Sequence, residues 1–488
     1  MQFLTPGAKV AKKNCPSIER VKIMAKNCDE ATRDRVCEEL KTAFGERFSS
    51  NLSVRQAHSH NITALYQQCP DGVVYATSKD DVAKIVKICA HYKMPIIAFG
   101  AGSSIEGQLN APKGGISIDF SKMDQVVSFS PEDMTITVQP GITRETLNSW
   151  LRDSGLFFPI DPGADASIGG MASTRASGTN AVRYGTMREA VLSAEAVMAD
   201  GSIIHTASRA KKSAAGYDLT RLLVGSEGTL GIFTEITVRL HPIPEVVSCG
   251  ACTFPTVTDA CNAVIESIQC AIPFARVELL DEFMTKACNA YSGLTLDPLP
   301  TLCVEFHGDK TSVAAQVALF GEIAASHGSK DFKHSTDPDK RAELWKARHE
   351  AFWAAQASLP DCDVFSTDAC VPISRLADCV GETQKDLQEH HLIGPMVGHV
   401  GDGNFHVLLG YHKGNKEEEK KVYEFSERLS ERAISMDGTC TGEHGIGQRK
   451  AKYLRLELGN AVDYMWAIKK ALDPDNILNP GKYGFEDY

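Results

Sequence analysis

Two histidines stand on either side of a tight turn in MVGHVGDGNFHVLLG, residues 396–410. His399 and His406 are an odd number of positions apart, so a continuous strand would point their side chains to opposite faces. A turn over Gly401–Asn404 would bring both imidazoles to one point. Such a pair is consistent with half of a metal site, and equally with a hairpin that carries two hydrogen-bonded histidines.

A second stretch, GTCTGEHGIGQRK at residues 438–450, could supply the missing groups. Two imidazoles and one carboxylate suit a borderline divalent ion such as zinc or manganese, with a coordination position left for a substrate. Glu443 and His444 are adjacent, so their side chains diverge. One is expected to bind the ion and the other to face the substrate. The alternative is a polar hairpin plus an unrelated glycine-rich loop.

Three glycine-rich segments precede these residues. FGAGSSIEG, residues 99–107, could approach an anion, although it lacks both the P-loop lysine and the GxGxxG fingerprint of a Rossmann fold. Residues 159–191 and 216–237 also mix glycine with Ser and Thr. Ordering three such loops in one domain is costly in conformational entropy. A dinucleotide that lies across all three would offset this cost.

Alternating strands and helices are expected to position these loops. Helical spacing at 80–94 and at 143–155, with Thr143 as N-cap, alternates with apolar strands up to about residue 242. This pattern predicts an α/β or α+β unit. The Pro-containing RLHPIPEVV is a candidate boundary, and a second mixed region follows it. There we expect a strand at 301–308 and helices at 339–356, 415–436 and 461–474.

The overall composition narrows the class of protein. A chain of 488 residues is too long for one ordinary core, and 43% hydrophobic with 23% charged residues is typical of a soluble globular protein. The net charge of −11 argues against a nucleic-acid partner. No window approaches the roughly 20 apolar residues of a membrane span, so no integral membrane segment is expected. Fifteen scattered cysteines favour reduced thiols in a cytosolic or organellar compartment.

The ordered set GAGSS, DPGADASIGG, RYGTMRE and GYDLTRLLVGSEGTLGI resembles the FAD domain of the vanillyl-alcohol-oxidase superfamily, in its D-lactate and D-2-hydroxy-acid dehydrogenase branch. The resemblance begins at about residue 65. It implies an α+β fold with a PCMH-type FAD-binding domain of two α/β subdomains and an α+β cap domain with an antiparallel sheet. The implied parts are an N-terminal helical segment (1–64), the FAD-binding domain (65–242), the substrate or cap domain (243–435), and a C-terminal segment (436–488) that carries GEHG and returns to the FAD domain.

The same resemblance assigns cofactor-binding residues to all three loops. The pyrophosphate would be held by Gly100, Gly102, Ser103 and Ser104. The flavin and ribityl chain would be lined by Pro162, Gly163, Ser167, Gly170, Met171, Thr174 and Ser177, and the adenine half by Gly228, Gly231 and Ile232. Covalent members of the superfamily use His or Cys near the first loop. The serines found there imply non-covalent FAD.

The family pattern also assigns roles around the histidines. His399, His406 and Glu443 match its metal ligands, for zinc or manganese, and His444 matches its catalytic base. Arg348 matches its substrate arginine, although an ordinary helix-face arginine is the alternative. Asn404 could hydrogen-bond the substrate or simply supply a left-handed turn. The implied reaction is oxidation of a D-2-hydroxy acid by hydride transfer to N5 of FAD, with the metal polarising the hydroxyl.

The identity of the substrate depends on one missing charge. Ser366 and Thr367 are neutral where the 2-hydroxyglutarate branch tends to carry a lysine, which favours D-lactate or a longer apolar D-2-hydroxy acid. D-2-hydroxyglutarate oxidation is an alternative. So are a transferase like alkylglycerone-phosphate synthase, which lacks GHVGDGNFH, and a metallohydrolase, which would need no flavin. The family context implies an electron acceptor (cytochrome c, a quinone or an electron-transfer flavoprotein), a mitochondrial or otherwise cytoplasmic soluble protein, and a homodimer as one option.

Overall fold

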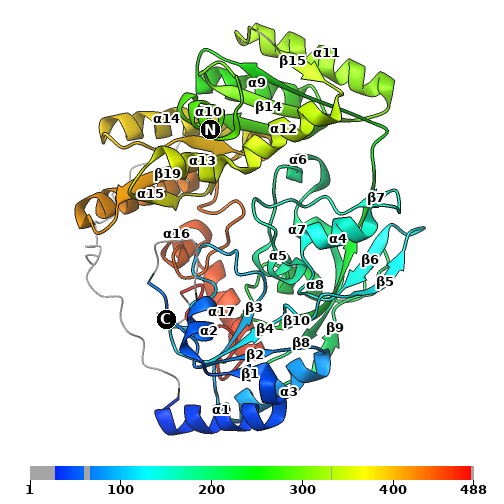
Figure 1. The fold of residues 1–488 in the computed structure, drawn as a ribbon, viewed down its shortest axis with the longest axis vertical. Helices are drawn as coiled ribbons and strands as arrows, with labels where there is room; N and C mark the ends of the chain where they lie inside the picture. Colours follow the sequence, from blue (N-terminus) through cyan, green and yellow to red (C-terminus); the bar gives the residue numbers. More distant parts are fainter. Residues whose placement is uncertain (1–27, 60–65, 331, 485–488) are drawn as a thin grey trace, which may run out of the picture.

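The computed structural model describes residues 28–59, 66–330 and 332–484 (Figure 1). The first of its sheets along the chain has four strands. Its strand order is β1 (Phe48–Ser49), β2 (Gly72–Tyr75), β4 (Ile116–Asp119) and β3 (Ile96–Phe99), with β1 antiparallel and the other three parallel. The helices packed on it are α1 (Glu30–Phe44), α2 (Leu52–Ala57) and α3 (Lys79–His91). Ser78 caps α3, whose apolar residues fall on one buried face.

Part of the N-terminal segment assigned to 1–64 belongs to this sheet. Buried residues of α1 share a hydrophobic cluster with α3 and β4, and β1 is an edge strand. Residues 1–27 and 60–64 of that segment lie outside the described residues. The described part of the segment therefore extends the first sheet of the predicted FAD-binding domain (65–242), which we call the cofactor region.

A five-stranded antiparallel sheet makes up the second half of the cofactor region. Its order is β5 (Val126–Ser130), β6 (Thr135–Val138), β10 (Ile232–Arg239), β8 (Val191–Val197) and β9 (Ile203–His205). The helices beside it are α4 (Arg144–Leu151), α5 (Ile168–Thr174), α6 (Ala181–Tyr184), α7 (Met187–Ala190) and α8 (Leu219–Leu223). Thr143 caps α4 through its side chain, as the sequence predicts. The short strands β7 (Leu156–Phe157) and β11 (His241–Pro242) pair with each other where the chain leaves this region.

The second region is built on an eight-stranded antiparallel sheet, which confirms the predicted cap architecture. Its order is β15 (Lys333–Ser335), β12 (Val246–Thr253), β14 (Thr301–Gly308), β13 (Phe274–Leu280), β18 (Met396–Gly398), β19 (Asn404–His412) and β16 (Cys362–Ser366), and β17 (Ala369–Cys370) also pairs with β19. The strand predicted at 301–308 is observed over that whole range.

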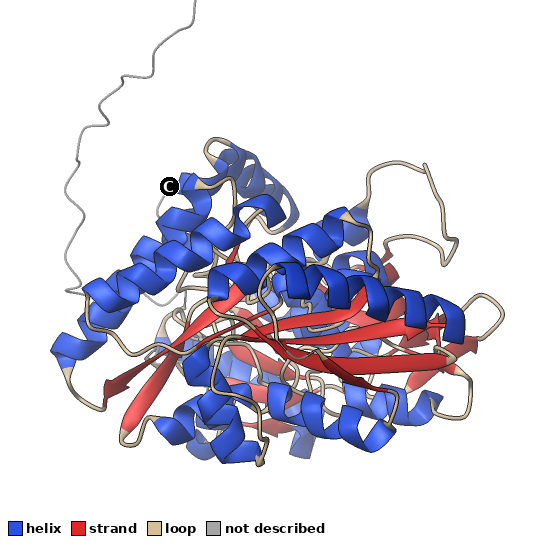
Figure 2. Ribbon diagram, turned by 90° about the horizontal axis from the view of Figure 1, so that it is seen from above, coloured by secondary structure: helices blue, strands red, loops and turns tan. Residues whose placement is uncertain are grey.

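Helices pack on both faces of the cap sheet (Figure 2). One hydrophobic cluster involves α9 (Val257–Gln269), α11 (Lys310–Ser326), α14 (Leu376–Glu389) and α15 (Lys416–Ser435). Another involves α10 (Glu282–Ser292), α12 (Pro338–His349) and α13 (Ala351–Ser358). The single helix predicted at 339–356 is therefore two helices, separated at Glu350. Helical periodicity could not reveal this break, because no glycine or proline marks it.

The C-terminal segment returns to the first sheet through α16 (Leu454–Leu458) and α17 (Ala461–Leu472), which lie beside the cofactor region in Figure 1. The amide of Ile96 in β3 donates to the carbonyl of Ile477 at 2.7 Å, and the amide of Asn479 donates back to the carbonyl of Ile96 at 2.8 Å. Within the described ranges, no helix combines the length and apolar character needed to cross a membrane.

Candidate active site

The turn between β18 and β19 brings the two histidines together. Val397 pairs with His406, and His399 follows the end of β18 directly. Gly403 takes φ +78°, and a Cβ there would lie 2.1 Å from the carbonyl oxygen of Val371, so only glycine fits the turn. The rings of His399 and His406 are 5.6 Å apart and nearly perpendicular. The predicted folding at this turn is confirmed.

Glu443 lies between the two imidazoles. Its Oε1 is 3.3 Å from Nε2 of His399 and 3.2 Å from Nε2 of His406. Two ligand atoms that are each about 2.0–2.1 Å from a tetrahedral zinc ion lie about 3.3 Å apart, so this spacing fits a shared cation. The other oxygen of Glu443 accepts a hydrogen bond from the Ser177 hydroxyl at 2.6 Å.

The outward nitrogen of each imidazole also has a partner. Nδ1 of His399 is 2.7 Å from Oε1 of buried Glu278, and Nδ1 of His406 donates to the carbonyl of Thr367 at 3.0 Å. Metal-binding histidines are commonly oriented in this way, with one nitrogen left for the ion. Burial alone would raise the pKa of Glu443, but the two imidazoles hold it well below its usual range. The carboxylate therefore stays ionised, as a metal ligand requires.

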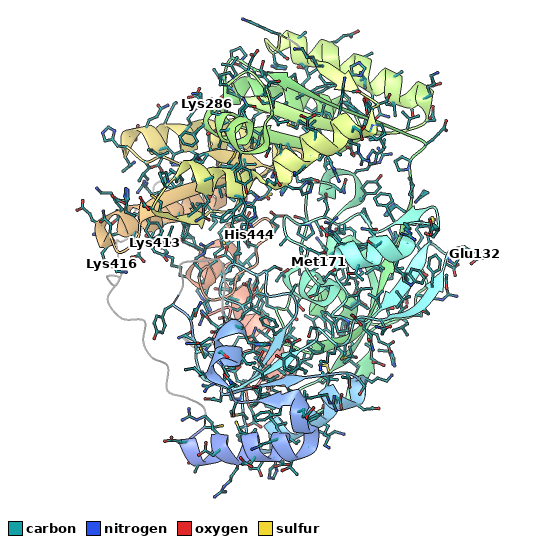
Figure 3. All side chains as sticks on the ribbon, in the orientation of Figure 1. Glu132, Met171, Lys286, Lys413, Lys416 and His444 are labelled. Carbon is teal, nitrogen blue, oxygen red and sulfur yellow. The ribbon has the colours of Figure 1, made fainter. Side chains whose placement is uncertain are left out.

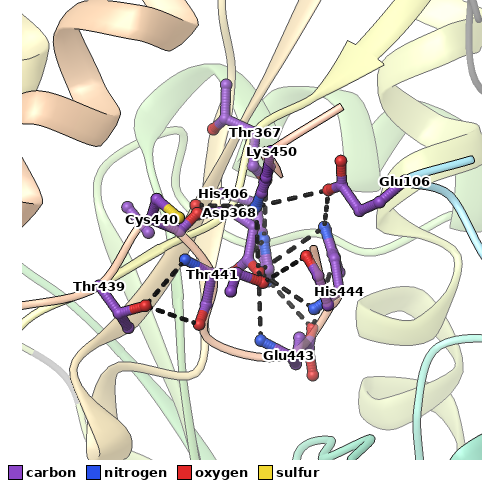
Figure 4. Close-up of polar contacts among 12 residues, drawn as sticks. Glu106, Thr367, Asp368, His406, Thr439, Cys440, Thr441, Glu443, His444 and Lys450 are labelled. Atoms are coloured by element: carbon purple, nitrogen blue, oxygen red, sulfur yellow. Dashed lines mark hydrogen bonds and ion pairs between the residues drawn. The ribbon is translucent and has the colours of Figure 1, made fainter. Parts of the chain in front are cut away.

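His444 packs against this group from the adjacent loop, which we call the GEHG loop (residues 441–448). Its ring stacks on His406 at 4.9 Å with an interplanar angle of 10°. Its Nε2 is 3.8 Å from Oε1 of Glu443, and its Nδ1 is 3.5 Å from Oε1 of Glu106 (Figure 4). One ring nitrogen thus faces the triad of His399, His406 and Glu443, while the other faces a buried carboxylate.

A group of buried charges supports the GEHG loop. Oδ2 of Asp368 accepts from the backbone amides of Glu443 and His444, both at 3.1 Å, and Nζ of Lys450 lies 3.4 Å away. Burial alone would raise the pKa of Asp368, but Lys450 and the nearby histidines hold it well below its usual range. Asp368, His406 and His444 are also close enough to form a metal cluster. The Lys450 ammonium, however, opposes a cation there, so the triad that contains Glu443 is the better metal site.

Glu106 is the other carboxylate of this group. It is fully buried and is paired with the guanidinium of Arg449, while Nζ of Lys450 lies 3.4 Å away. Burial alone would raise the pKa of Glu106, but these cations and His444 lower it to about 2. Glu106 therefore presents a permanent negative charge to Nδ1 of His444.

One cavity of about 520 Å³ connects this group with the glycine-rich loops. All fourteen residues predicted to bind the cofactor line it: Gly100, Gly102, Ser103, Ser104, Pro162, Gly163, Ser167, Gly170, Met171, Thr174, Ser177, Gly228, Gly231 and Ile232. Arg348, His399, His406, Glu443 and His444 line the same cavity. Figure 3 shows His444 between the cap and cofactor regions, and Met171 in the cofactor region.

The walls of this cavity fit a large polar cofactor such as FAD. The hydroxyl oxygen of Ser104 is buried and has no hydrogen-bond partner among the described residues, so a donor or acceptor is available to a ligand. In the part of the chain that the structure describes, a Cβ at Gly163 would meet no atom within 4 Å, and one at Gly228 would meet only Ala98 at 3.8 Å. Side chains there would project into open space, which leaves the backbone accessible to a ligand.

Arg348 and Asn404 occupy different positions relative to the cavity. Arg348 lines it, with its guanidinium paired to Glu278. Asn404 does not line it, since its amide donates to Asp368 at 2.7 Å and to the carbonyl of Ala369 at 2.8 Å. The left-handed residue of the turn is Gly403, with φ +78°, rather than Asn404. Asn404 thus supports Asp368 through a hydrogen bond. Contact between Asn404 and the substrate stays a prediction.

Four residues of the site were not predicted from the sequence: Glu106, Glu278, Asp368 and Lys450. Glu106 and Lys450 lie inside the glycine-rich stretches 99–107 and 438–450, and Asp368 directly follows Ser366 and Thr367. A charged residue among glycines or apolar residues was the available signal. Glu278 stands in a buried strand, and that burial is known only from the fold.

Comparison with known proteins agrees with this geometry. Residues 70–207 match the family model described as "FAD binding domain", and residues 243–483 match "FAD linked oxidases, C-terminal domain". The chain is 49% identical to "Probable D-lactate dehydrogenase, mitochondrial" of Danio rerio over 93% of this chain and 92% of the relative. It is 45% identical to "D-lactate dehydrogenase [cytochrome], mitochondrial" of Arabidopsis thaliana over 91% and 79%.

Solved structures share the fold at low sequence identity. Alkyldihydroxyacetonephosphate synthase has a TM-score of 0.72 at 18% identity, covering 97% of this chain and 89% of the other. p-Cresol methylhydroxylase has a TM-score of 0.74 at 16% identity. These likenesses confirm the PCMH-type α+β fold and nothing more. The chain belongs to the FAD-linked oxidase family and is an FAD-dependent oxidoreductase.

Proposed function

We propose that this enzyme oxidises a D-2-hydroxy acid, with D-lactate as the first candidate and pyruvate as its product. The observation that carries the proposal is the single cavity that joins the fourteen cofactor-loop residues to His399, His406, Glu443 and His444. The names of the D-lactate dehydrogenases at 45–49% identity support the same substrate. A metallohydrolase would have no use for the part of this cavity that the fourteen cofactor-loop residues line.

FAD, when bound, supplies the hydride acceptor, and a Zn²⁺ or Mn²⁺ ion held by His399, His406 and Glu443 would supply a Lewis acid that polarises the substrate hydroxyl. Glu278, the Thr367 carbonyl and Ser177 keep these three ligands oriented. The protein thus presents an oriented ligand set, with its carboxylate ionised, before substrate arrives.

His444 is the proposed base. Glu106 faces Nδ1 and favours a proton there, which leaves Nε2, on the side of Glu443, to accept the proton of the substrate hydroxyl. Stacking on His406 limits rotation of the ring. The proton therefore leaves the hydroxyl toward a nitrogen fixed within the cavity.

The cavity favours a substrate with one carboxylate. Among its described lining residues, Arg348 is the only Arg or Lys, and Glu278 already neutralises part of its charge. The nearby wall includes apolar Val397, Leu408 and Phe352. We assign the substrate carboxylate to the remaining hydrogen-bonding capacity of Arg348, and the substrate's side chain to the apolar wall. A second carboxylate, as in 2-hydroxyglutarate, would find no further cation there.

The relatives' names also support a cytochrome-type electron acceptor and a mitochondrial location, which we propose for this chain. The reaction itself is tested by an anaerobic absorbance spectrum of the FAD-loaded protein with D-lactate or L-lactate. The flavin absorbance band at about 450 nm should bleach with D-lactate and not with L-lactate. Chelation of the metal should slow bleaching without releasing FAD. A flavin that stays oxidised with D-lactate and with longer apolar D-2-hydroxy acids would refute the proposal.

A further inference from the structure

A buried carboxylate that the proposed reaction does not use lies at the junction of the cofactor loops. Glu227 is 4% exposed and lines the shared cavity beside Gly228. Burial raises its pKa to about 7, although several amide hydrogen bonds oppose this rise. Keeping an acidic side chain here is costly, so the contacts it makes are informative.

Glu227 holds the GEHG loop through backbone amides. Its Oε1 accepts from the amide of Ile446 at 2.7 Å, and its Oε2 accepts from the amide of Gly447 at 2.9 Å. A Cβ at Gly445 would lie 2.3 Å from Oε1 of Glu227. The GEHG loop thus approaches the carboxylate closely, and Gly445 has φ +80°, a conformation that favours glycine.

The same residue contacts the other two glycine-rich loops. The backbone amide of Glu227 donates to the carbonyl of Ser173 at 2.8 Å, in the second loop. Gln108, which follows the first loop, donates from Nε2 to Oε1 of Glu227 at 3.4 Å and to the carbonyl of His444 at 2.9 Å. Ser173, Gln108 and Glu227 all line the cavity. Glu227 is therefore linked on one side to the cofactor loops and on the other to the loop that carries His444.

The backbone at Glu227 indicates that its side chain is needed. Its φ is +52°, in the left-handed region that glycine adopts more easily. The neighbouring sequence, GSEGTLG, has glycine on both sides, yet the strained position carries glutamate. A non-glycine residue in this conformation is strained and persists where the surroundings require the side chain.

We propose that Glu227 is a positioning residue that couples occupancy of the cofactor site to the geometry of the GEHG loop. FAD that orders the three glycine-rich loops would fix Glu227 and Gln108, and these would fix the backbone of residues 444–447. His444 would then reach its working position only in the FAD-loaded enzyme. This inference rests on the proposed role of His444, but the coupling itself can be measured without catalysis.

The test is hydrogen exchange of peptides that cover residues 441–448, with and without FAD, in the full chain and in the presence of a metal chelator. In the wild-type protein, FAD should slow this exchange by about 10-fold or more, and in Glu227→Gln by less than about 2-fold. By reciprocity, the Kd of FAD should weaken in the variant by a similar factor. A purely structural role would change exchange equally with and without FAD.

The matched control is Glu195→Gln. Glu195 is also a buried carboxylate of the cofactor region, but its partners are Thr234, Lys79 and His205, away from the GEHG loop. This variant should show the wild-type effect of FAD. Should Glu227→Gln fail to fold, Gln108→Met removes the bond to the His444 carbonyl with little change in shape, and it should also reduce the effect of FAD.

Two outcomes would overturn the inference: no slowing by FAD in the wild-type protein, or full slowing in Glu227→Gln. Either can occur while D-lactate still bleaches the flavin, and then the proposed function stands and the coupling alone fails. A flavin that D-lactate does not bleach, with normal slowing of exchange by FAD, would instead refute the proposed function and leave the coupling in place.

Discussion

Arg348 donates from Nε to Oε2 of Glu278 at 2.8 Å, and its Nη2 lies 2.6 Å from the same oxygen. The other oxygen of Glu278 is 2.7 Å from Nδ1 of His399. One buried carboxylate thus orients both the proposed substrate arginine and a proposed metal ligand. Glu278 therefore supports both the proposed binding of the substrate carboxylate and the proposed binding of the metal.

Glu278→Gln should therefore weaken metal binding. Loss of a carboxylate that orients a ligating imidazole typically costs about 10- to 100-fold in metal affinity, and the FAD affinity should stay within about 2-fold of wild type. Titration of the FAD-loaded protein with Zn²⁺ or Mn²⁺ in a calorimeter measures the change. Glu195→Gln is the control, and metal affinity equal to wild type in Glu278→Gln would show that His399 needs no such orientation.

His444→Gln should slow reduction of the flavin by D-lactate by about 10²- to 10⁴-fold, the usual contribution of a general base. Content of FAD and metal should be unchanged, because His444 is not among the metal triad. Anaerobic stopped-flow absorbance gives the rate. His349→Gln is the matched control, since His349 lines the same cavity but its Nδ1 bonds to the carbonyl of Trp345. An equal loss of the flavin reduction rate in His444→Gln and His349→Gln would show that His444 is not the base.

Ser177→Ala should affect the metal more than the flavin. Although the family pattern assigns Ser177 to the flavin, its hydroxyl donates to Glu443 at 2.6 Å. Removing a hydrogen bond to a charged group costs about 1.5–3 kcal/mol, so metal affinity should fall by about 10-fold or more. Thr174→Ala is the comparison, since its hydroxyl bonds only within α5, to the carbonyl of Gly170. Stronger loss of FAD than of metal in Ser177→Ala would favour the family assignment.

Asp281 provides a test of stability against pH. It caps α10 by accepting from the amide of Met284, and burial raises its pKa from the ordinary 3.8 to about 7. Between these two values the folded chain holds a proton that the unfolded chain releases, so stability falls as pH rises from about 4 to 7. Asp281→Asn removes this effect and caps equally well. Its urea midpoint relative to wild type should therefore rise with pH over that range.

Asp309→Asn is the control with the opposite sign. Asp309 caps α11, and the amides of Ser312 and Thr311 hold its pKa below the ordinary value. The stabilising effect of ionised Asp309 is present above pH 3.8 and is lost at lower pH. The urea midpoint of Asp309→Asn relative to wild type should therefore fall as pH rises through this range. If the urea midpoint of Asp281→Asn differed from that of wild type by the same amount from pH about 4 to 7, this would contradict the raised pKa of Asp281.

Local patterns predicted the elements of this fold well. The amphipathic helix expected at 415–436 is observed as Lys416–Ser435, and the turn that joins His399 to His406 is present. Both depend on residues close together in the chain: a helical period with an Asn415 cap in one case, and a glycine in the other. The glycine-rich loops were placed by resemblance, and all their assigned residues line one cavity.

The buried charges could not be predicted in this way. His399 and Glu278 are 121 positions apart, and the carbonyl of His444 and Gln108 are 336 positions apart. No periodicity connects such residues, and a charged residue in a strand or loop is usually solvated. Only the packing of cap, cofactor loops and C-terminal segment brings these groups together.

The return of the chain to β3 has a consequence for how the enzyme is made. Ile477 and Asn479 bond to the edge of β3, Lys482 donates to the carbonyl of Asn110 at 2.8 Å, and Tyr483 bonds to the carbonyl of Gly225. During synthesis on the ribosome, domains generally fold as they emerge. The edge of β3 and the loops at Asn110 and Gly225 gain these partners only once residues 477–483 have been made, so we expect the flavin-binding half to complete its contacts later than the cap.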